Sequence, residues 1–276
     1  MKAPFAYYGG KTGLAPKIVE LFPAHKVYIE PFFGSGAVFF SKPRVPVEII
    51  NDSHHAVATF FRVLRDHRED LEEACALSPH SRTEFKASDV HEPVGDVEVA
   101  RRFWVRVNQS FGKTAGNTGF SVTTARNQSI PGSVRSRLGR FEACAERLMG
   151  ATIESCDAAG LVERLATPES VVYADPPYLG AVRKMRDDSA GDYAVDMPSV
   201  ADHERLAEAL NATDAAVVLS GYQSDAYDSL YSGWERVEFD VPVASSNAVT
   251  KARGARVEVL WMNFEPHVGQ LFSSGA

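Results

Sequence analysis

The segment with the most constrained chemistry is Asp175-Pro176-Pro177-Tyr178, which directly follows the apolar run 171–174. Two consecutive prolines donate no backbone hydrogen bonds and have a fixed φ, so they stiffen the turn after the expected strand. Asp175 is therefore held where α/β sheets bind ligands, with backbone carbonyls as further acceptors and the Tyr178 ring as a flat surface. Such a cluster suits a planar base that bears an amino group. A turn that only joins a strand to a loop is the alternative.

A second candidate site is the Gly34-Ser35-Gly36 turn, which follows the apolar run 27–30. A glycine-rich turn after the first strand is where α/β sheets bind nucleotides. The full dinucleotide fingerprint fails, because Phe39 stands where the third Gly belongs. Asp52 comes 18 residues after Gly34, near the spacing at which a carboxylate accepts hydrogen bonds from ribose hydroxyls. The two features together predict a nucleoside-containing ligand, and a plain tight turn is the alternative.

The segment Gly9-Gly10-Lys11-Thr12 resembles part of a phosphate-binding loop. The leading Gly of that pattern would fall at Phe5, and no expected strand precedes the segment, so this interpretation is rejected. Lys11 beside two glycines could still reach a ligand carboxylate. A solvated surface lysine is the alternative.

Strands and helices are expected to alternate along most of the chain. Apolar runs predict buried strands at 27–30, 47–50, 151–154, 171–174, 215–220 and 256–264. Helical spacing predicts a helix start at 37–40, one long helix over 56–76, a helix at 99–108 and a capped helix at 199–212. This order indicates an α/β fold with a mostly parallel, doubly wound sheet. Residues 78–148, rich in Ser, Thr, Asn, Gly and Arg, break the alternation and are interpreted as an insertion.

Charge is distributed unevenly along the chain. The net charge is −7, yet residues 101–147 hold nine Lys and Arg against two Glu, a balance of +7, which leaves −14 for the rest. This asymmetry predicts an acidic body with one basic face toward a polyanion. A solvated basic surface without a partner is the alternative.

Composition excludes several classes of protein. A chain of 276 residues suits one large domain, or one domain with a second inserted into it. No apolar run reaches 18 residues, which argues against a membrane span, and the first residues lack the apolar core of a secretory signal. Three scattered cysteines and eight histidines show no disulfide or metal-ligand spacing. We therefore expect a cytoplasmic protein that needs no metal.

Five ordered motifs resemble those of the Dam-like, alpha-group (DPPY-type) adenine-N6 DNA methyltransferases. They are Tyr7-Tyr8-Gly9-Gly10-Lys11, Glu30-Pro31-Phe32-Phe33-Gly34-Ser35-Gly36, Asn51-Asp52, Asp175-Pro176-Pro177-Tyr178, and Ser245-Ser246-Asn247 with Arg253 and Glu258. The likeness spans about residues 5–264. Asp-Pro-Pro-Tyr alone is shared by several amino-methyltransferase groups, whereas the complete ordered set is specific to this family.

The resemblance implies a doubly wound Rossmann-like methyltransferase sheet with an inserted, mainly helical target-recognition domain. Residues 1–55 and 149–276 would form the catalytic domain, and residues 56–148 would bind DNA. The implied cofactor is S-adenosylmethionine, in the cytoplasm of a bacterial or phage-infected cell. Its implied binding residues are Tyr7, Lys11, Glu30, Pro31, Phe32, Gly34, Gly36, Asp52, Asp157 and Asp175. Lys11 would lie near the donor's carboxylate, Asp52 would bind the ribose hydroxyls and Asp157 would contact the adenine ring. Tyr7 stands where the family often has Trp.

The resemblance also implies a catalytic group and a DNA-binding group. Asp175, Pro176, Pro177 and Tyr178 would act on a base flipped out of duplex DNA, which stacks on Tyr178. The Asp175 carboxylate and the Pro176 carbonyl would accept the hydrogens of the adenine amine, whose lone pair is otherwise delocalised into the ring. Lys113, Asn117, Arg126, Asn127, Arg135 and Arg137 would contact the duplex. Residues 108–113 follow the family's pattern only in part, so the recognition sequence does not transfer.

Three other functions stay open from the residues. A nicotinamide-dependent oxidoreductase would share the glycine turn and Asp52. A non-catalytic DNA-binding module would need only the basic insertion. A cytosine-N4 methyltransferase would act on another exocyclic amine with similar acceptors, although the motif order and the Asp before Pro176 favour adenine.

Overall fold

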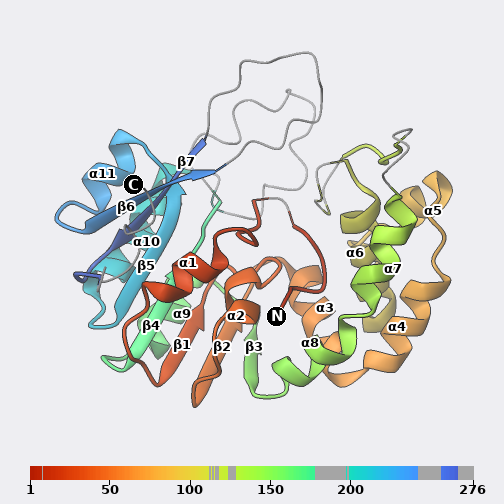
Figure 1. The fold of residues 1–276 in the computed structure, drawn as a ribbon, viewed down its shortest axis with the longest axis horizontal. Helices are drawn as coiled ribbons and strands as arrows, with labels where there is room; N and C mark the ends of the chain where they lie inside the picture. Colours follow the sequence, from red (N-terminus) through yellow and green to blue (C-terminus); the bar gives the residue numbers. More distant parts are fainter. Residues whose placement is uncertain are drawn as a thin grey trace, which may run out of the picture.

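The computed structural model describes residues 1–7, 9–111, 113, 115, 118–123, 129–177, 197, 199–241 and 256–266. Within them the centre is a seven-stranded sheet of order β3-β2-β1-β4-β5-β7-β6 (Figure 1). The strands are β1 (Val27–Glu30), β2 (Val47–Asn51), β3 (Ala151–Glu154), β4 (Ser170–Ala174), β5 (Ala216–Tyr222), β6 (Glu235–Val241) and β7 (Arg256–Met262).

The direction of the strands brings the functional segments to one edge of the sheet. Strands β3, β2, β1, β4 and β5 run parallel, while β7 runs antiparallel to both β5 and β6. The chain winds from β1 toward β3 and from β4 toward β5, so its direction switches between the neighbours β1 and β4, where α/β sheets bind ligands. Because β7 is antiparallel, its first residues share this edge, and Glu258 lies opposite Tyr222 of β5. The predicted mostly parallel, doubly wound sheet is confirmed.

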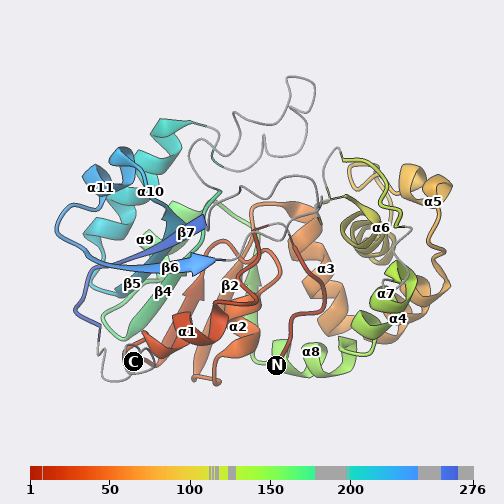
Figure 2. The same cartoon turned by 45° about the horizontal axis from the view of Figure 1, so that its top comes forward.

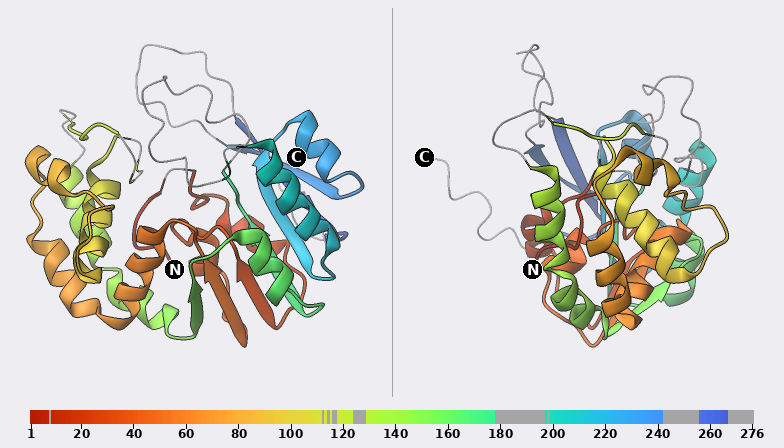
Figure 3. Two further views of the ribbon diagram at one scale, coloured as in Figure 1. Left: turned by 180° about the vertical axis from the view of Figure 1, so that it is seen from behind. Right: turned by 90° about the vertical axis from the view of Figure 1, so that its right-hand side faces the viewer.

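Helices cover both faces of the sheet (Figure 1; Figure 3, left). One face packs on α1 (Ala15–Glu20), α2 (Ala37–Ser41) and α3 (His55–Asp66), and the other on α9 (Ala158–Leu165), α10 (Val200–Ala212) and α11 (Asp225–Leu230). Successive strand residues alternate between the two apolar layers, as Tyr28 and Ile29 do. Burial on both sides explains why these strands are apolar runs in the sequence.

A helical lobe lies beside the β3 edge of the sheet (Figures 1 and 2). It contains α4 (Arg68–Leu77), α5 (Arg82–Ala87), α6 (Asp96–Gln109), α7 (Ile130–Leu138) and α8 (Phe141–Leu148). Helix α3 joins lobe and sheet: the Phe60 ring stacks on Trp104 of α6 at 6.2 Å, and the Phe61 ring lies 4.6 Å from that of Phe33. The segment between β2 and β3 is thus mainly helical in its described parts, while the domain boundary at residue 56 stays a prediction.

The predicted single helix over 56–76 was wrong. His67, with φ −135° and ψ 43°, separates α3 from α4, whose first turn carries Glu69 and Asp70. Carboxylates are favourable at a helix N-terminus, so this second start was readable from the sequence. Helix α7 was not predicted from the sequence. Pro131 in its first turn and the Ser129 cap favour a helix, but none of its residues is buried, so it shows no apolar periodicity.

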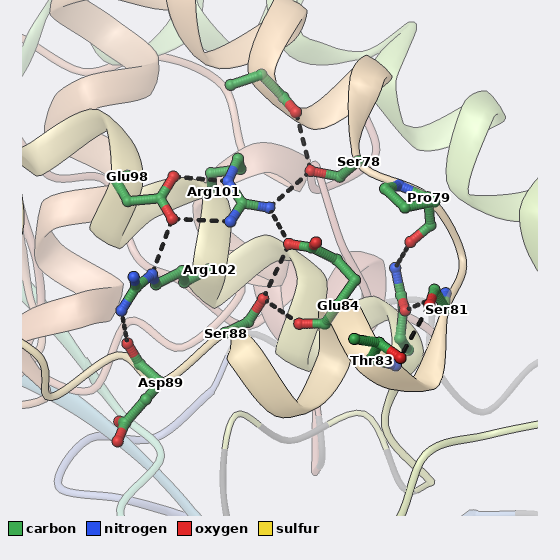
Figure 4. A network of polar contacts seen from close by, with 12 residues as sticks. Ser78, Pro79, Ser81, Thr83, Glu84, Ser88, Asp89, Glu98, Arg101 and Arg102 are labelled. Carbon is green, nitrogen blue, oxygen red and sulfur yellow. Dashed lines mark hydrogen bonds and ion pairs between the residues drawn. The ribbon is translucent and has the colours of Figure 1, made fainter.

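Ion pairs within the helical lobe correct the charge argument (Figure 4). Arg101 of α6 contacts Glu98 at 2.6 Å and Glu84 at 2.5 Å, and Arg102 contacts Glu98 at 2.8 Å. The hydrogen bonds from Arg101 lower the pKa of Glu98 to about 2. Other carboxylates outside residues 101–147 also take part: Glu92 pairs with Arg102, and Glu48 of β2 with the buried Arg147. The +7 balance of that segment therefore overstates the basic charge available to a polyanion.

Candidate active site

Lys11 is a buried lysine, only 7% exposed, in the loop before α1. Gly9, at φ 72°, and the hydrogen bond from the Gly10 amide to the Tyr7 carbonyl (3.0 Å) turn the chain so that Lys11 points toward the sheet. Its ammonium lies 2.8 and 2.9 Å from the two carboxylate oxygens of Asp175, and 3.2 Å from the Gly9 carbonyl. The solvated-surface alternative for Lys11 is thus excluded.

Asp175 is the first residue after β4, beside the end of β1. Its side chain is 19% exposed, so one side of the carboxylate faces Lys11 while part of it stays accessible. Pro176 is buried and Pro177 half-buried, which agrees with a stiff corner. Tyr178 lies outside the described residues, and its predicted stacking role stays a prediction.

Glu258 is the second carboxylate at the Lys11 ammonium. It lies on β7, 3.2 Å from Lys11 Nζ, and accepts a hydrogen bond of 2.8 Å from Ser220 Oγ on β5. Both residues are buried, Glu258 at 6% and Ser220 at 0% exposure. Glu258 was recognised from the sequence only as part of a motif, and Ser220 was missed. The signal was a charged residue inside the apolar run 256–264, since a buried charge requires a partner.

The surroundings of Lys11 and Glu30 raise the pKa of both side chains above their ordinary values. Burial opposes the charged form of Lys11, but the neighbouring Asp175 and Glu258 carboxylates outweigh this effect and the pKa of the ammonium is raised. Burial raises the pKa of Glu30, at the end of β1, to about 8, although the Tyr28 hydroxyl donates a hydrogen bond to it at 2.7 Å. Glu30 is therefore mostly protonated at neutral pH.

In the glycine turn after β1, two aromatic rings pack closely against the glycine backbone. Gly34 (φ 49°) and Gly36 (φ 68°) both adopt left-handed conformations that favour glycine. A Cβ on Gly36 would lie 2.4 Å from the Phe33 ring, and one on Gly34 would lie 3.4 Å from the Tyr7 ring. The predicted residues Tyr7 and Gly34 therefore lie together, whereas Pro31 is buried and Phe32 packs on the opposite apolar layer.

Asp52 and Asn51 tie the ends of three strands together. Asp52 accepts hydrogen bonds from the Gly34 amide (2.8 Å) and the His54 amide (2.9 Å). The buried Asn51 side chain donates to the carbonyls of Pro31 (2.9 Å) and Cys156 (3.1 Å), and accepts from the Cys156 amide (2.9 Å). The predicted proximity of the glycine turn and Asp52 is thus seen. Asn51 holds the loops after β1 and β3 together, and the sequence did not reveal these hydrogen bonds.

Asp157 lies at the N-terminus of α9. Its carboxylate accepts a hydrogen bond of 2.7 Å from the Gly160 amide and pairs with Arg205 of α10 at 2.8 Å. The side chain is 55% exposed. These contacts cap a helix and link it to its neighbour, and the expected contact of Asp157 with an adenine ring stays a prediction.

Part of the predicted DNA-binding group lies around Asn108 of α6. Arg137 of α7 donates to Asn108 Oδ1 at 2.5 Å, and the Lys113 ammonium lies 3.4 Å from the Asn108 carbonyl. Burial lowers the pKa of both Lys113 and Arg137. Arg135 is exposed on the same helix as Arg137. Asn117, Arg126 and Asn127 lie outside the described residues, as do Tyr8, Ser245, Ser246, Asn247 and Arg253.

Two absences apply to the described part of the chain. No group of three or more His, Cys, Asp or Glu side chains there could hold a metal ion. No helix in the same residues is long and apolar enough to cross a membrane.

The candidate site lies at the switch point of a parallel sheet, the place where α/β proteins bind ligands. Residues 7–242 match the family described as D12 class N6 adenine-specific DNA methyltransferase. The chain therefore belongs to this family, and it is an enzyme that methylates adenine in DNA. The family resemblance stated from the motifs is confirmed.

The chain is also similar to one named methyltransferase and, more distantly, to two solved structures. The chain is 27% identical over 283 residues to the type II methyltransferase M1.LlaDCHI of Lactococcus lactis subsp. cremoris, covering 95% of both chains. Among solved structures, the precorrin 8w decarboxylase of Methanobacterium thermoautotrophicum is 8% identical, with 95% of this chain and 98% of that chain covered and a TM-score of 0.42. A conserved hypothetical protein of Streptococcus pyogenes is 11% identical, with 91% and 94% covered and a TM-score of 0.31. Structural likeness this low carries no argument about function.

Proposed function

We propose that the enzyme transfers a methyl group from S-adenosylmethionine to the exocyclic N6 of an adenine that has been flipped out of duplex DNA. The observation that carries this proposal is the Asp175 carboxylate at the switch point, fixed by Lys11 and next to the glycine turn of β1. An acceptor for an amine and a turn for a nucleoside ligand thus lie on neighbouring strands.

The residues around the turn suit the proposed donor. Gly34 and Gly36 have positive φ, which holds the turn in a conformation that favours glycine, and the Tyr7 and Phe33 rings pack against it. Asp52 is oriented by two backbone amides at the position where a carboxylate would accept hydrogen bonds from ribose hydroxyls. Tyr7, Lys11, Glu30, Pro31, Phe32 and Asp157 are the other residues that we assign to this site. The bound donor would supply a methyl group on a positively charged sulfur.

The chain's own residues would act on the amine. The Asp175 carboxylate and the Pro176 carbonyl would accept the two N6 hydrogens, which favours a nitrogen lone pair that points away from them. Positive charge develops on N6 as the new bond forms, and a fixed carboxylate in a site shielded from water stabilises it by several kcal/mol. Asp175 or a water molecule would then take the proton that N6 loses. Pro177 would keep the corner stiff, and Tyr178 would stack on the flipped base.

The helical lobe is the proposed target-recognition domain. Residues 56–148 would bind the duplex, and residues 1–55 and 149–276 would carry the chemistry. Support comes from the lobe's place beside the β3 edge of the sheet (Figure 2), from Arg137 and Lys113 near Asn108, and from the exposed Arg135. Asn117, Arg126 and Asn127 complete the proposed DNA contacts. Cationic side chains would hold the phosphates, while amides would read base edges.

The decisive experiment combines the wild-type enzyme, S-adenosylmethionine with a labelled methyl group, and duplex DNA of mixed sequence, followed by nucleoside analysis. We expect the label in N6-methyladenine. Label in N4-methylcytosine would show that cytosine is the target base and would overturn the proposal for adenine. DNA that stays unlabelled would overturn the proposed methyl transfer as a whole. The same reaction with Asp175→Ala is the matched control, since it removes the carboxylate that would accept the amine hydrogen, while Lys11 keeps Glu258 as an ionic partner.

A further inference from the structure

The active site holds one ammonium between two carboxylates that come from different strands. Lys11 Nζ lies 2.8 Å from Asp175 and 3.2 Å from Glu258, and all three side chains are largely buried. Asp175 follows β4, whereas Glu258 belongs to the antiparallel strand β7, with β5 between them. The proposed function uses Asp175 and leaves Glu258 without a task.

The geometry of Lys11 creates a conflict with the proposed chemistry. Its ammonium contacts both oxygens of Asp175, at 2.8 and 2.9 Å. These are the oxygens that would have to accept a hydrogen from the target amine and face the positive charge that develops on it. An ammonium held on Asp175 alone would compete with the amine and cancel the field of the carboxylate. The site therefore needs a second anion that can take up Lys11 when the amine arrives.

We propose that Glu258 is a positioning residue that shares the Lys11 ammonium with Asp175 and retains it when the target amine occupies the Asp175 carboxylate. This role of Glu258 rests on the proposed function. Transfer of Lys11 from one partner to the other would require only a small movement, because both carboxylates are already within 3.2 Å of Nζ. Lys11 would stay charged and paired throughout, which avoids the large cost of a buried, unpaired ammonium.

Ser220 fixes Glu258 for this role. The Ser220 hydroxyl donates to Oε1 of Glu258 at 2.8 Å, the same oxygen that lies nearest Lys11. Ser220 is fully buried in the interior strand β5, and Glu258 is held by the β5–β7 ladder. A carboxylate fixed by two strands and a hydroxyl is preorganised and does not have to be ordered during the reaction.

Other ionisable groups that interact with this cluster are Glu30 of β1, Tyr173 of β4 and Tyr227 of α11. Burial raises the pKa of all three side chains, and Asp175 contributes to each increase. All three are therefore mostly neutral near pH 7. The paired carboxylates Asp175 and Glu258 are the anions that act on Lys11, and both raise its pKa against the effect of burial.

The test is Glu258→Gln in the full-length enzyme, with wild type as the reference and Glu238→Gln as the matched control. Gln keeps an oxygen for Ser220 and Lys11 but has no charge, while Glu238 is a half-exposed residue of β6 paired with Arg236. The assay is methyl transfer from S-adenosylmethionine to duplex DNA. For Glu258→Gln we expect kcat to fall about 10- to 100-fold with KM for DNA within about twofold. The alkaline limb of kcat should move to lower pH, since Lys11 loses one of the anions that raise its pKa.

A second variant keeps the test decisive if Glu258→Gln does not fold. Ser220→Ala retains the charge and removes only the hydroxyl that orients it, and we expect a smaller fall of kcat, about 3- to 10-fold, with no change of KM. Wild-type kcat and pH profile in Glu258→Gln, or in Ser220→Ala when the first variant is unfolded, would overturn the role of Glu258 while leaving the proposed function intact. A wild-type enzyme that transfers no methyl group would instead overturn the proposed function, and this role with it.

Discussion

Glu30 allows the electrostatics of the site to be measured without a substrate. It lies at the end of β1, is 2% exposed and accepts a hydrogen bond from Tyr28. Burial raises its pKa from 4.5 to about 8, and the charge on Asp175 adds to this increase. The substitution that tests this is Glu30→Gln, which keeps the size of the side chain and cannot ionise.

The expected effect follows from the difference in pKa between the folded and unfolded states. A carboxyl whose pKa is higher in the folded protein stabilises it fully below about pH 4.5, and this contribution is lost as the pH rises to about 8. One pKa unit corresponds to about 1.4 kcal/mol, so the loss amounts to about 5 kcal/mol as an upper value. Glu30→Gln lacks this loss, and the variant should gain stability relative to the wild type as the pH increases.

The assay is urea unfolding of both proteins at a series of pH values from 4.5 to 9. We expect the variant-minus-wild-type difference in the free energy of unfolding to rise up to about pH 8 and then to level off, whatever its sign at pH 4.5. Glu69→Gln, at a residue of α4 whose side chain is 86% exposed, serves as the control. Parallel curves for wild type and Glu30→Gln would show that Glu30 is already ionised in the folded protein, and would refute the reasoning.

Three further predictions concern the lobe and the strand ends. Replacing Arg135 and Arg137 together by Ala should weaken duplex binding and reduce the slope of log K against log salt by about 0.9 for each phosphate that is no longer neutralised. Binding titrations at several salt concentrations check this, and an unchanged slope would remove both residues from the DNA interface. Asn51→Ala should lower the free energy of unfolding by about 2–3 kcal/mol, because the Pro31 carbonyl and the Cys156 carbonyl and amide lose their hydrogen bonds to the side chain. A loss below about 0.5 kcal/mol on urea unfolding would contradict this. Glu98→Gln should cost about 1 kcal/mol at pH 7, discounted for the 37% exposure of the side chain. Since Arg101 lowers the pKa of Glu98 from 4.5 to about 2, that cost should vanish as the pH falls through this range, and a cost that persists at pH 2 would exclude the ion pair as its cause.

The sheet was readable from the sequence because its strands are buried on both faces. Continuous apolar runs such as 171–174 predicted β4, and the turn residues after them located the carboxyl edge where the candidate site lies. Edge strand β6 (Glu235–Val241) was missed, although its alternating charged and apolar residues are the pattern of a half-buried strand. Helix α7 was missed because none of its residues is buried, so it has no apolar periodicity.

The residues of the site were easier to predict than the contacts between them. Lys11, Asp52 and Asp175 could be identified because each belongs to a short sequence motif. The pairing of Lys11 with Glu258 joins the two ends of the chain and depends on β7 running antiparallel to β5, a topological choice that residue spacing does not encode. Charge counting failed similarly for Arg101 and Arg102, whose carboxylate partners lie outside the counted segment.

The central claim is that the fixed Asp175 carboxylate accepts a hydrogen bond from the amine of the target adenine, while the neighbouring glycine turn binds the methyl donor. Single-turnover transfer to DNA, measured together with calorimetric titration of S-adenosylmethionine, tests it most directly on Asp175→Ala and Asp52→Ala. We expect that Asp175→Ala binds the donor within a few-fold of wild type but loses at least about 1000-fold in transfer rate, whereas Asp52→Ala is impaired mainly in donor affinity. Transfer at the wild-type rate by Asp175→Ala would contradict the claim.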